Sequence, residues 1–551
     1  MSSVDQARRW IFRDGSEPVA TLTLMNQLIG ALQQPANVPD RSLDALLAAG
    51  ELECALADNC DPGASSAAKL TDLLATTFLC PHIDSSSTCF AMFAEIQRVT
   101  QIASAKVSPP EGFAYYALHP SQFADPFPDR STPASAAIVG IRTIGTTLSA
   151  VSAASLRLRG WNTSRITVRP QGDPYNRVAQ FSPEQHKRIQ SALHDSGAFI
   201  VVDEGPGLSG SSLLSVAEAL ENAGVPAHRI TLLGTRQPDP DALYAADAVQ
   251  RWSRFHWRCT SSTRYGDIPG SAWSGGQWRA DLYRSEHDWP ACWPQLERIK
   301  YRKPQHLLKF DGLGRFGNTV RERAELLCHA GFGPKPTKST DGLTQYDFVS
   351  GTPLTRSDIS LEVLETIARY CAFRAREFHT SRTPEHNLRS MALLNCSLEF
   401  SLEPDLREES FFAESPIIPD GRMLPHEWIR TPDGQLCKTD AGSHGDDHFF
   451  PGPTDIAWDL AGTIVEWDLS PAQATFLIAR YTKISGDDPS ARLPDFVVAY
   501  AVFRQSFCYM ASLAVSDPRE RSRLQAHQRV YRAKLQSILR SQPTRPGRSI
   551  A

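Results

Sequence analysis

Between residues 111 and 236, four short apolar runs alternate with segments of helical periodicity. The runs read AAIVGI, RITVRP, AFIVV and RITLLGT, and the helical segments include SAVSAASLRLRG and SSLLSVAEALENAG. Strands that alternate with helices of about 10–15 residues form βαβ units, which require a parallel sheet. The runs are apolar along their whole length, as expected for strands that helices cover on both faces. We therefore predict a parallel-sheet α/β domain.

The rest of the chain divides into four parts around this domain, whose predicted bounds are 106–240. Residues 1–105 are predicted to be a helical N-terminal segment, because stretches such as SLDALLAAGELECALAD space apolar residues three and four apart. Residues 241–300 hold six of the eleven Trp and are predicted to be a connector, or the start of the next domain, in which large rings pack between domains. A mixed pattern over 301–515 predicts an α+β domain. Residues 516–551 are expected to be a basic helix with a disordered tail.

Composition excludes several classes of protein. The 551 residues carry a net charge of −4, so no basic excess draws the chain to nucleic acid or to an anionic membrane. No run of about 18 apolar residues occurs and the first residues lack an apolar core, so we expect neither a membrane span nor a signal peptide. The 11 Cys include no CxxC pair and are expected to be reduced. We predict a cytoplasmic protein, and a protein partner or a homo-oligomer stays open.

An acidic pair and a glycine-serine turn follow the third apolar run. Asp203 and Glu204 end that run, and GPGLSGSS comes next. Backbone N–H groups in a glycine-rich turn before a helix bind phosphate, and the helix N-terminus adds a positive dipole. The turn is one letter from a Walker A loop, but Ser211 stands where that loop needs lysine. Because acids repel phosphate but suit hydroxyls or bound Mg²⁺, we predict a ligand with the layout of ribose 5-phosphate.

Residues 111–236 resemble the type I phosphoribosyltransferases. The family signature of an apolar strand, two acids, a loop and Thr-Gly reads here FIVVDEGPGLSGSS, with a loop one residue longer and Ser for Thr. The resemblance implies that Asp203 and Glu204 are catalytic residues facing the ribose of phosphoribosyl pyrophosphate (PRPP), with Mg²⁺ on the leaving pyrophosphate. It also implies PRPP-binding residues in the phosphate turn, the pyrophosphate loop and a loop over the site, namely Ser209, Gly210, Ser211, Ser212, Arg142, Thr143, Gly145, Arg169 and Arg177. The alternative is an inactive Rossmann-like domain.

A second constellation begins with Lys309 on a β run, followed thirteen residues later by Glu322 in a helix and then by the strand and loop GLTQYDFVSGTPL. This order, over about 300–515, resembles the aminoglycoside phosphotransferase and choline kinase branch of the protein-kinase-like fold. The resemblance implies an α+β kinase-like domain in which Lys309 binds the phosphates of ATP and pairs with Glu322.

Kinase-like enzymes also need one Asp that orients the acceptor hydroxyl and a second, about 20 residues later, that holds Mg²⁺. Asp420 and Asp440 have this spacing and are our candidates for the catalytic and the metal-binding residue, although Pro425 stands where the family has Asn. A rival register takes Asp446 and Asp455 from HGDDHFFPGPTD. A third interpretation takes a transition-metal site from this stretch, with ligands His444, Asp446, Asp447 and His448.

These observations lead to one hypothesis and one alternative. The hypothesis is a bifunctional enzyme that combines PRPP-dependent phosphoribosyl transfer, or its reverse, with ATP-dependent phosphorylation of a hydroxyl on a small nucleotide-like molecule. The alternative is a non-catalytic sensor or scaffold that binds nucleotide or PRPP and has a degenerate kinase domain. The sequence does not name the acceptor.

Overall fold

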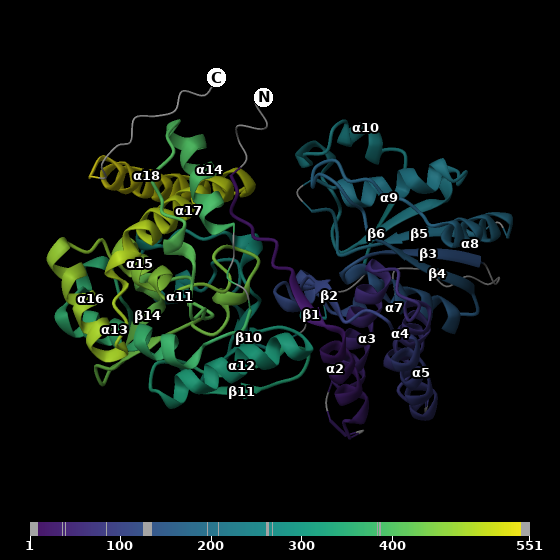
Figure 1. The fold of residues 1–551 in the computed structure, drawn as a ribbon, viewed down its shortest axis with the longest axis horizontal. Helices are drawn as coiled ribbons and strands as arrows, with labels where there is room; N and C mark the ends of the chain where they lie inside the picture. Colours follow the sequence, from purple (N-terminus) through teal and green to yellow (C-terminus); the bar gives the residue numbers. More distant parts are fainter. Residues whose placement is uncertain are drawn as a thin grey trace.

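The computed structural model describes residues 9–35, 37–38, 40–83, 85–124, 135–195, 197–207, 209–260, 264–266, 268–382, 384 and 387–541. The predicted disordered tail after residue 541 lies outside them. The chain forms an N-terminal half built on a parallel sheet and a mainly helical C-terminal half, which lie side by side (Figure 1).

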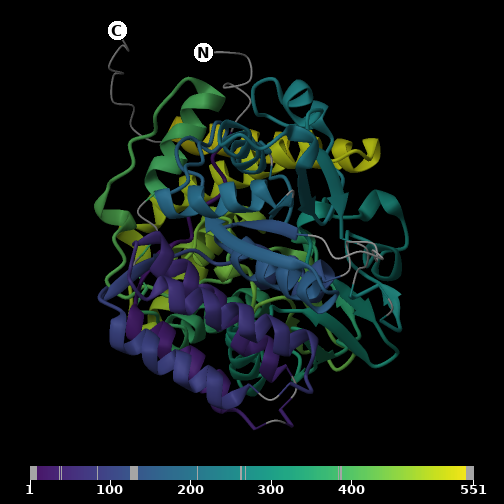
Figure 2. The ribbon, with the colours of Figure 1, turned by 90° about the vertical axis from the view of Figure 1, so that its right-hand side faces the viewer.

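The N-terminal half opens with four helices and a two-stranded antiparallel ladder. In chain order these elements are β1 (Glu17–Ala20), α2 (Thr21–Gln33), α3 (Arg41–Asp58), α4 (Ala64–Leu79), α5 (Ser86–Val99) and β2 (Ser104–Val107), followed by the short α6 (Glu111–Ala114). The predicted helical segment is confirmed, and the β1–β2 ladder is an addition to it. In Figure 2 these helices pack beneath the parallel sheet.

A five-stranded parallel sheet follows, with the strand order β4-β3-β5-β6-β7. Its elements are β3 (Ser135–Ile141), α7 (Ile144–Leu158), β4 (Asn162–Val168), α8 (Pro183–His194), β5 (Ala198–Val202), α9 (Ser211–Asn222), β6 (Ile230–Gly234), α10 (Ala248–Trp252) and β7 (His256–Cys259). The four apolar runs are β3 to β6, so the predicted parallel sheet is confirmed. Strand β7 carries the sheet past the predicted boundary at residue 240.

Alternate residues of the parallel strands face two separate cores. Ile138 and Ile200 pack in the core that α7 shares with the N-terminal helices. Val139 and Val201 pack on the other face, in the core formed with α8 and α9. Burial on both faces is the reason that these strands read as continuous apolar runs.

The C-terminal half combines two small antiparallel sheets with a helical core. One sheet has the order β11-β12-β10-β9-β8 and the other β13-β14-β15. The strands are β8 (Ser271–Ala272), β9 (Lys300–Arg302), β10 (His306–Phe310), β11 (Pro336–Lys338), β12 (Leu343–Asp347), β13 (Thr352–Pro353), β14 (Trp428–Arg430) and β15 (Leu436–Lys438). The helices are α11 (Arg279–Leu282), α12 (Gly314–His329), α13 (Leu361–Glu377), α14 (Leu388–Phe400), α15 (Ala457–Glu466), α16 (Pro471–Ser485), α17 (Leu493–Ala514) and α18 (Pro518–Ser541).

One predicted segment changes with this topology. The Trp-rich stretch 241–300 supplies β7 to the parallel sheet and β8 to the next sheet, so it is divided between the halves and is not a connector alone.

Among the described residues, α17 is the one helix long and apolar enough to cross a membrane. However, 83% of its apolar window is buried within the protein, and α18 packs along it, as in the core of a folded domain.

Candidate functional site

A cavity of about 220 Å³ lies in the C-terminal half. Its walls come from β9, β10, the segment 347–349 after β12, the loop 422–427 and the loop after β15. Tyr115 and Tyr116, just after α6, add a wall from the N-terminal half. Six cationic side chains line the cavity, namely Arg298, Lys300, Lys309, Arg422, Lys438 and Arg504, together with the rings of Trp273, Trp278 and Trp293.

Lys309 and Asp440, which are 131 positions apart, meet in this cavity. The Lys309 Nζ donates to Asp440 Oδ1 and to Ser443 Oγ, both at 2.8 Å. The Lys300 Nζ donates to the other carboxylate oxygen of Asp440 at 2.7 Å. Burial alone would raise the pKa of Asp440, but the two ammonium groups outweigh it and hold that pKa well below its ordinary value. The predicted convergence of Lys309 and Asp440 is therefore present in the structure.

The predicted pair of Lys309 with Glu322 is wrong. Glu322 is exposed on α12, whereas Val320, Ala324 and Leu327 form the buried face of that helix. Residues that are three, four and seven apart share one helix face, and Glu322 is out of phase with them. The ion pairs of Lys309 go to Asp440 and Asp311 instead.

Asp420 does not line the cavity, so the structure does not bring it to Lys309 and Asp440, and its catalytic role stays a prediction. Its side chain is fully buried, accepts a hydrogen bond from the Tyr370 hydroxyl, and lies 3.2 Å from the Lys438 Nζ. The same loop turns Arg422 and Glu427 toward the cavity.

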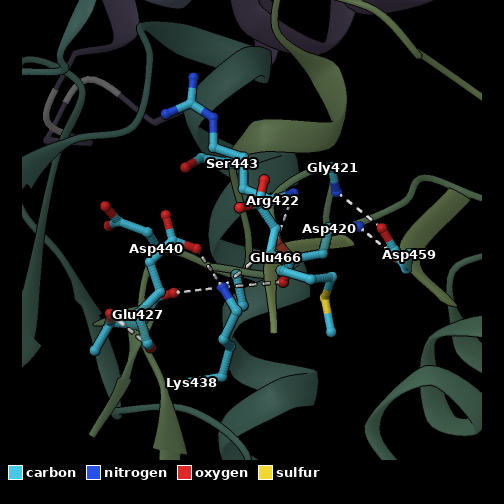
Figure 3. Close-up of polar contacts among 12 residues, drawn as sticks. Asp420, Gly421, Arg422, Glu427, Lys438, Asp440, Ser443, Asp459 and Glu466 are labelled. Atoms are coloured by element: carbon cyan, nitrogen blue, oxygen red, sulfur yellow. Dashed lines mark hydrogen bonds and ion pairs between the residues drawn. The ribbon is translucent and has the colours of Figure 1, made fainter. Parts of the chain in front are cut away.

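A residue far along the chain fixes the conformation of the loop that runs from Asp420 to Glu427. Asp459, in the first turn of α15, accepts from the backbone N–H groups of Asp420 and Gly421 at 2.8 and 3.0 Å (Figure 3). Because the Asp459 carboxylate fixes these two amides, the loop presents its residues from 422 onward to the cavity.

A lysine pairs with two of the three residues in the one cluster of metal-ligand types found among the described residues. Ligand atoms of Asp420, Glu427 and His444 lie within 4.8 Å of one another. The Lys438 Nζ lies 2.8 Å from Glu427 Oε2 and 3.2 Å from Asp420 Oδ2 (Figure 3). A divalent ion bound by both carboxylates does not fit these residues, because the Lys438 ammonium already pairs with both of them. The Mg²⁺ predicted at Asp440 requires Lys300 or Lys309 to give way.

The rival register of Asp446 and Asp455 is not at the cavity either. Asp446 pairs with Arg323 at 2.6 Å and Arg382 at 2.8 Å, and these guanidinium groups lower its pKa although burial opposes them. Asp455 pairs with Arg492 at 2.9 Å and caps the start of α15. Both carboxylates therefore join structural elements.

The four residues of the proposed transition-metal site do not converge. His444, Asp447 and His448 line the cavity, but among the described residues their ligand atoms form no close group with one another or with Asp446, and the imidazole of His448 meets the Tyr116 hydroxyl at 2.8 Å and stacks on Phe12. Burial lowers the pKa values of His444 and His448, which keeps both rings neutral near pH 7. The transition-metal interpretation is therefore wrong in the part of the chain that the structure describes.

In the N-terminal half, Asp203 and Glu204 follow the carboxyl end of β5. Burial raises the pKa of Asp203 to about 7. Burial, followed by the nearby Glu111 and Asp203, raises the pKa of Glu204 to about 8. These two acids therefore hold protons far more tightly than ordinary carboxyl groups.

The predicted phosphate turn precedes α9, and another loop closes on it. Gly210 has a left-handed backbone (φ 68°) directly before Ser211 and Ser212, the first residues of α9. The hydroxyls of Ser209 and Ser211 donate to the Pro174 carbonyl at 2.8 and 2.7 Å. The loop that was predicted to cover the site therefore contacts the turn directly.

Two arginines, Arg142 of the predicted pyrophosphate loop and Arg169 of the loop predicted to cover the site, are held by helix α3. Arg169 donates to Asp58 of α3 at 2.8 Å and to the Thr143 hydroxyl at 3.1 Å, and Arg142 lies 3.4 Å from Asp58. Arg177 is half-buried and donates to the Gly172 carbonyl. Gly145 allows α7 to approach β5, since an added Cβ would lie 2.6 Å from the Val202 carbonyl oxygen.

The two sites are joined through α6. The backbone N–H of Gly112 donates to Glu204, and a Cβ at Gly112 would lie 2.8 Å from the Glu204 carboxylate. The next residues, Tyr115 and Tyr116, bond the Asp446 carbonyl and His448 beside the cavity. Sequence reasoning missed these tyrosines, and it also missed Arg422 and Lys438; the available signal for Lys438 was a charged residue inside the β run before Asp440.

Comparisons with known proteins were made for the whole chain. No family model matches it, and neither does any curated protein. Solved structures similar to it include the choline kinase LicA of Streptococcus pneumoniae (13% identity, 43% of this chain and 89% of that one, TM-score 0.29). Others are an ethanolamine kinase of Plasmodium vivax (11%, 44% and 81%, 0.31) and a choline/ethanolamine kinase family protein of Mesorhizobium loti (12%, 48% and 97%, 0.31). TM-scores this low carry no argument about the activity of this chain.

Proposed function

We propose that the C-terminal half is a kinase-like phosphotransferase domain that binds ATP. The observation that carries this proposal is the hydrogen bond between Lys309 and Asp440 in a cavity that residues 347–349 also line. A strand lysine beside a loop aspartate is the pair that kinase-like enzymes place on nucleotide phosphates. Aromatic walls suit a base, and the six cations suit its phosphates.

In this proposal the acceptor hydroxyl meets Asp447 and not Asp420. Asp447 lines the cavity, and the nearest cation is the Arg422 guanidinium at 3.7 Å. Burial raises its pKa, which brings the carboxyl group closer to a general base that works near neutral pH. The acceptor class is a small molecule with a hydroxyl.

A nucleotide sensor without phosphoryl transfer is the second candidate. It is favoured by Arg422, a cation in the loop that carries the acceptor-orienting Asp in kinases, and by Lys438 between the carboxylates of the same site. Such a domain would bind ATP and report its presence to the N-terminal half through Tyr115 and Tyr116.

Titration calorimetry of ATP against the full chain tests nucleotide binding. We expect Lys309→Met to weaken ATP at least about tenfold, because it removes a cation directed at the phosphates. Lys303→Met, in the turn between β9 and β10, is the matched control and should leave the affinity unchanged. Equal affinity of the Lys309 variant and the wild type would rule out this site.

Turnover then separates the two candidates. If the domain transfers phosphate, ATP consumption with a panel of hydroxyl acceptors should fall to background in Asp447→Asn while ATP still binds. Binding without turnover in the wild type across that panel would favour the sensor. If Asp447→Asn loses both turnover and ATP binding, the loss of turnover is explained by the loss of binding, and the proposed role of Asp447 in phosphate transfer is not supported.

We also propose that the parallel-sheet half binds PRPP or a related ribose 5-phosphate. Support comes from the acids after β5, from the turn at the start of α9 and from their place at the carboxyl ends of parallel strands, where α/β sheets bind ligands. Asp203→Asn should weaken PRPP binding in calorimetry, and the exposed Asp195→Asn should not. Unchanged PRPP affinity in Asp203→Asn would remove this assignment.

A further inference from the structure

Two carboxylates of the cavity region, Asp420 and Glu427, stand close enough to share a divalent cation. Their oxygens and a ring nitrogen of His444 lie within 4.8 Å of one another. Oxygen ligands at about 2.0–2.6 Å from a common centre are what Mg²⁺ and Ca²⁺ require. The geometry of the three ligands alone would therefore admit a cation.

The Lys438 ammonium already holds this position. Its side chain is fully buried, and its three N–H groups have three protein oxygens within reach: Glu427 Oε2 at 2.8 Å, Asp420 Oδ2 at 3.2 Å and the Thr439 carbonyl at 3.1 Å. An ammonium has three donors, so its bonding capacity is used completely. A divalent ion bound to the same carboxylates would lie about 3 Å from Lys438, where like charges repel strongly.

The second acidic group of the cavity is neutralised in the same way. Both carboxylate oxygens of Asp440 accept from lysines, at 2.7 Å from Lys300 and 2.8 Å from Lys309. Three lysines thus pair with the three carboxylates that a metal ion would otherwise bind.

Arg422 leaves positive charge available to a ligand. Its side chain is 29% exposed and lines the cavity, and the carboxylate with which it pairs, Asp447, is 3.7 Å away. A guanidinium binds phosphate oxygens through two parallel N–H donors. Arg422 can therefore contact phosphate without breaking a short ion pair, whereas each cavity lysine named above is already bonded to a carboxylate.

We propose that this cavity binds a nucleoside polyphosphate without a divalent cation, because lysine ammonium groups already pair with Asp420, Glu427 and Asp440, and that Arg422 is a phosphate ligand. The inference rests on the proposed nucleotide-binding function. In such a site, protein side chains bind the phosphates in the way that two bound metal ions do in other phosphoryl-transfer enzymes.

Calorimetry of ATP with the full chain, once with excess Mg²⁺ and once with EDTA, tests the proposal. We expect dissociation constants within about threefold of each other. Binding at least about tenfold tighter with Mg²⁺ would overturn the inference and leave the proposed nucleotide-binding function intact. Absence of binding under both conditions would instead overturn the proposed function.

Two variants examine the residues themselves. Arg422→Gln should weaken ATP about tenfold in EDTA, whereas Arg430→Gln, on the surface of β14, should not. Manganese alone, followed by electron paramagnetic resonance, should find no site in the wild type at the Asp420–Glu427 pair and a gained site in Lys438→Met. If the lysine variant does not fold, the Arg422 pair and the EDTA comparison still decide; an unchanged affinity in Arg422→Gln contradicts the proposal.

Discussion

At the residue scale, Asp420 and Asp440 differ in what surrounds them although each is paired with lysine. Asp440 lines the cavity and neutralises Lys300 and Lys309. Asp420 is sealed behind the loop, where the Tyr370 hydroxyl and the Lys438 Nζ both contact its Oδ2. A buried charge in such a network is costly to leave without its partner, so we expect Asp420 to stabilise the fold and Asp440 to act on the ligand.

The substitution Asp420→Asn should therefore lower the free energy of unfolding by about 3–5 kcal/mol, because it leaves the Lys438 charge partly unpaired in the core. Urea denaturation followed by tryptophan fluorescence measures this loss. Asp433→Asn, at an exposed turn after β14, is the matched control and should leave the urea midpoint unchanged. If Asp420→Asn removes ATP turnover at full stability, our placement of this residue is incorrect.

At the element scale, helix α3 and helix α4 are fastened to the parallel sheet through Arg165 of β4. Its guanidinium forms two 2.9 Å bonds with Glu53 of α3 and a 2.6 Å bond with Asp72 of α4. Arg165 and Glu53 are both buried. The N-terminal helices are thus part of the core of the parallel-sheet half and not a separate leader.

Glu53→Gln tests this attachment. It should cost about 3–5 kcal/mol of unfolding free energy, because Arg165 would lose its bidentate partner inside the protein. Glu51→Gln, two residues away on α3, breaks a pair with the more exposed Arg315 and should cost at most about 1 kcal/mol. Equal midpoints of the two variants in urea would contradict a structural role for Glu53.

The elements also mark where sequence reasoning succeeds. Strands β3 to β6 could be predicted because burial on both faces imposes a continuous apolar pattern within each strand. The direction of the Glu322 side chain could not be predicted in this way, because it depends on which face of α12 packs against the rest of the domain. The conformation of the loop at Asp420 could not be predicted either, because Asp459, 39 residues later, holds the backbone of that loop. Local pattern thus predicts elements, and contacts between distant residues decide which side chains reach the cavity.

At the scale of the whole molecule, α6 and the two residues after it contact both candidate sites. Gly112 contacts Glu204 on one side, and Tyr115 and Tyr116 reach the C-terminal cavity on the other. Leu313, after β10, donates its backbone N–H to the Phe113 carbonyl at 2.8 Å, so α6 is tied to the C-terminal half as well. A change in charge at Glu204 therefore occurs at the junction of the halves.

The protonation of Glu204 makes the stability of this junction depend on pH. Burial, with help from Glu111 and Asp203, raises the pKa of Glu204 from its ordinary value of 4.5 to about 8 in the folded chain. Between these two values the folded chain holds a proton that the unfolded chain releases, so the free energy of unfolding must fall as pH rises. Calorimetric melting at pH 6, 7 and 8 should give the highest melting temperature at pH 6. Glu204→Gln, which stays neutral at every pH, should have a smaller decrease between pH 6 and 8 than the wild type. An identical decrease in both proteins would mean that Glu204 is ionised in the folded state and that the junction tolerates its charge.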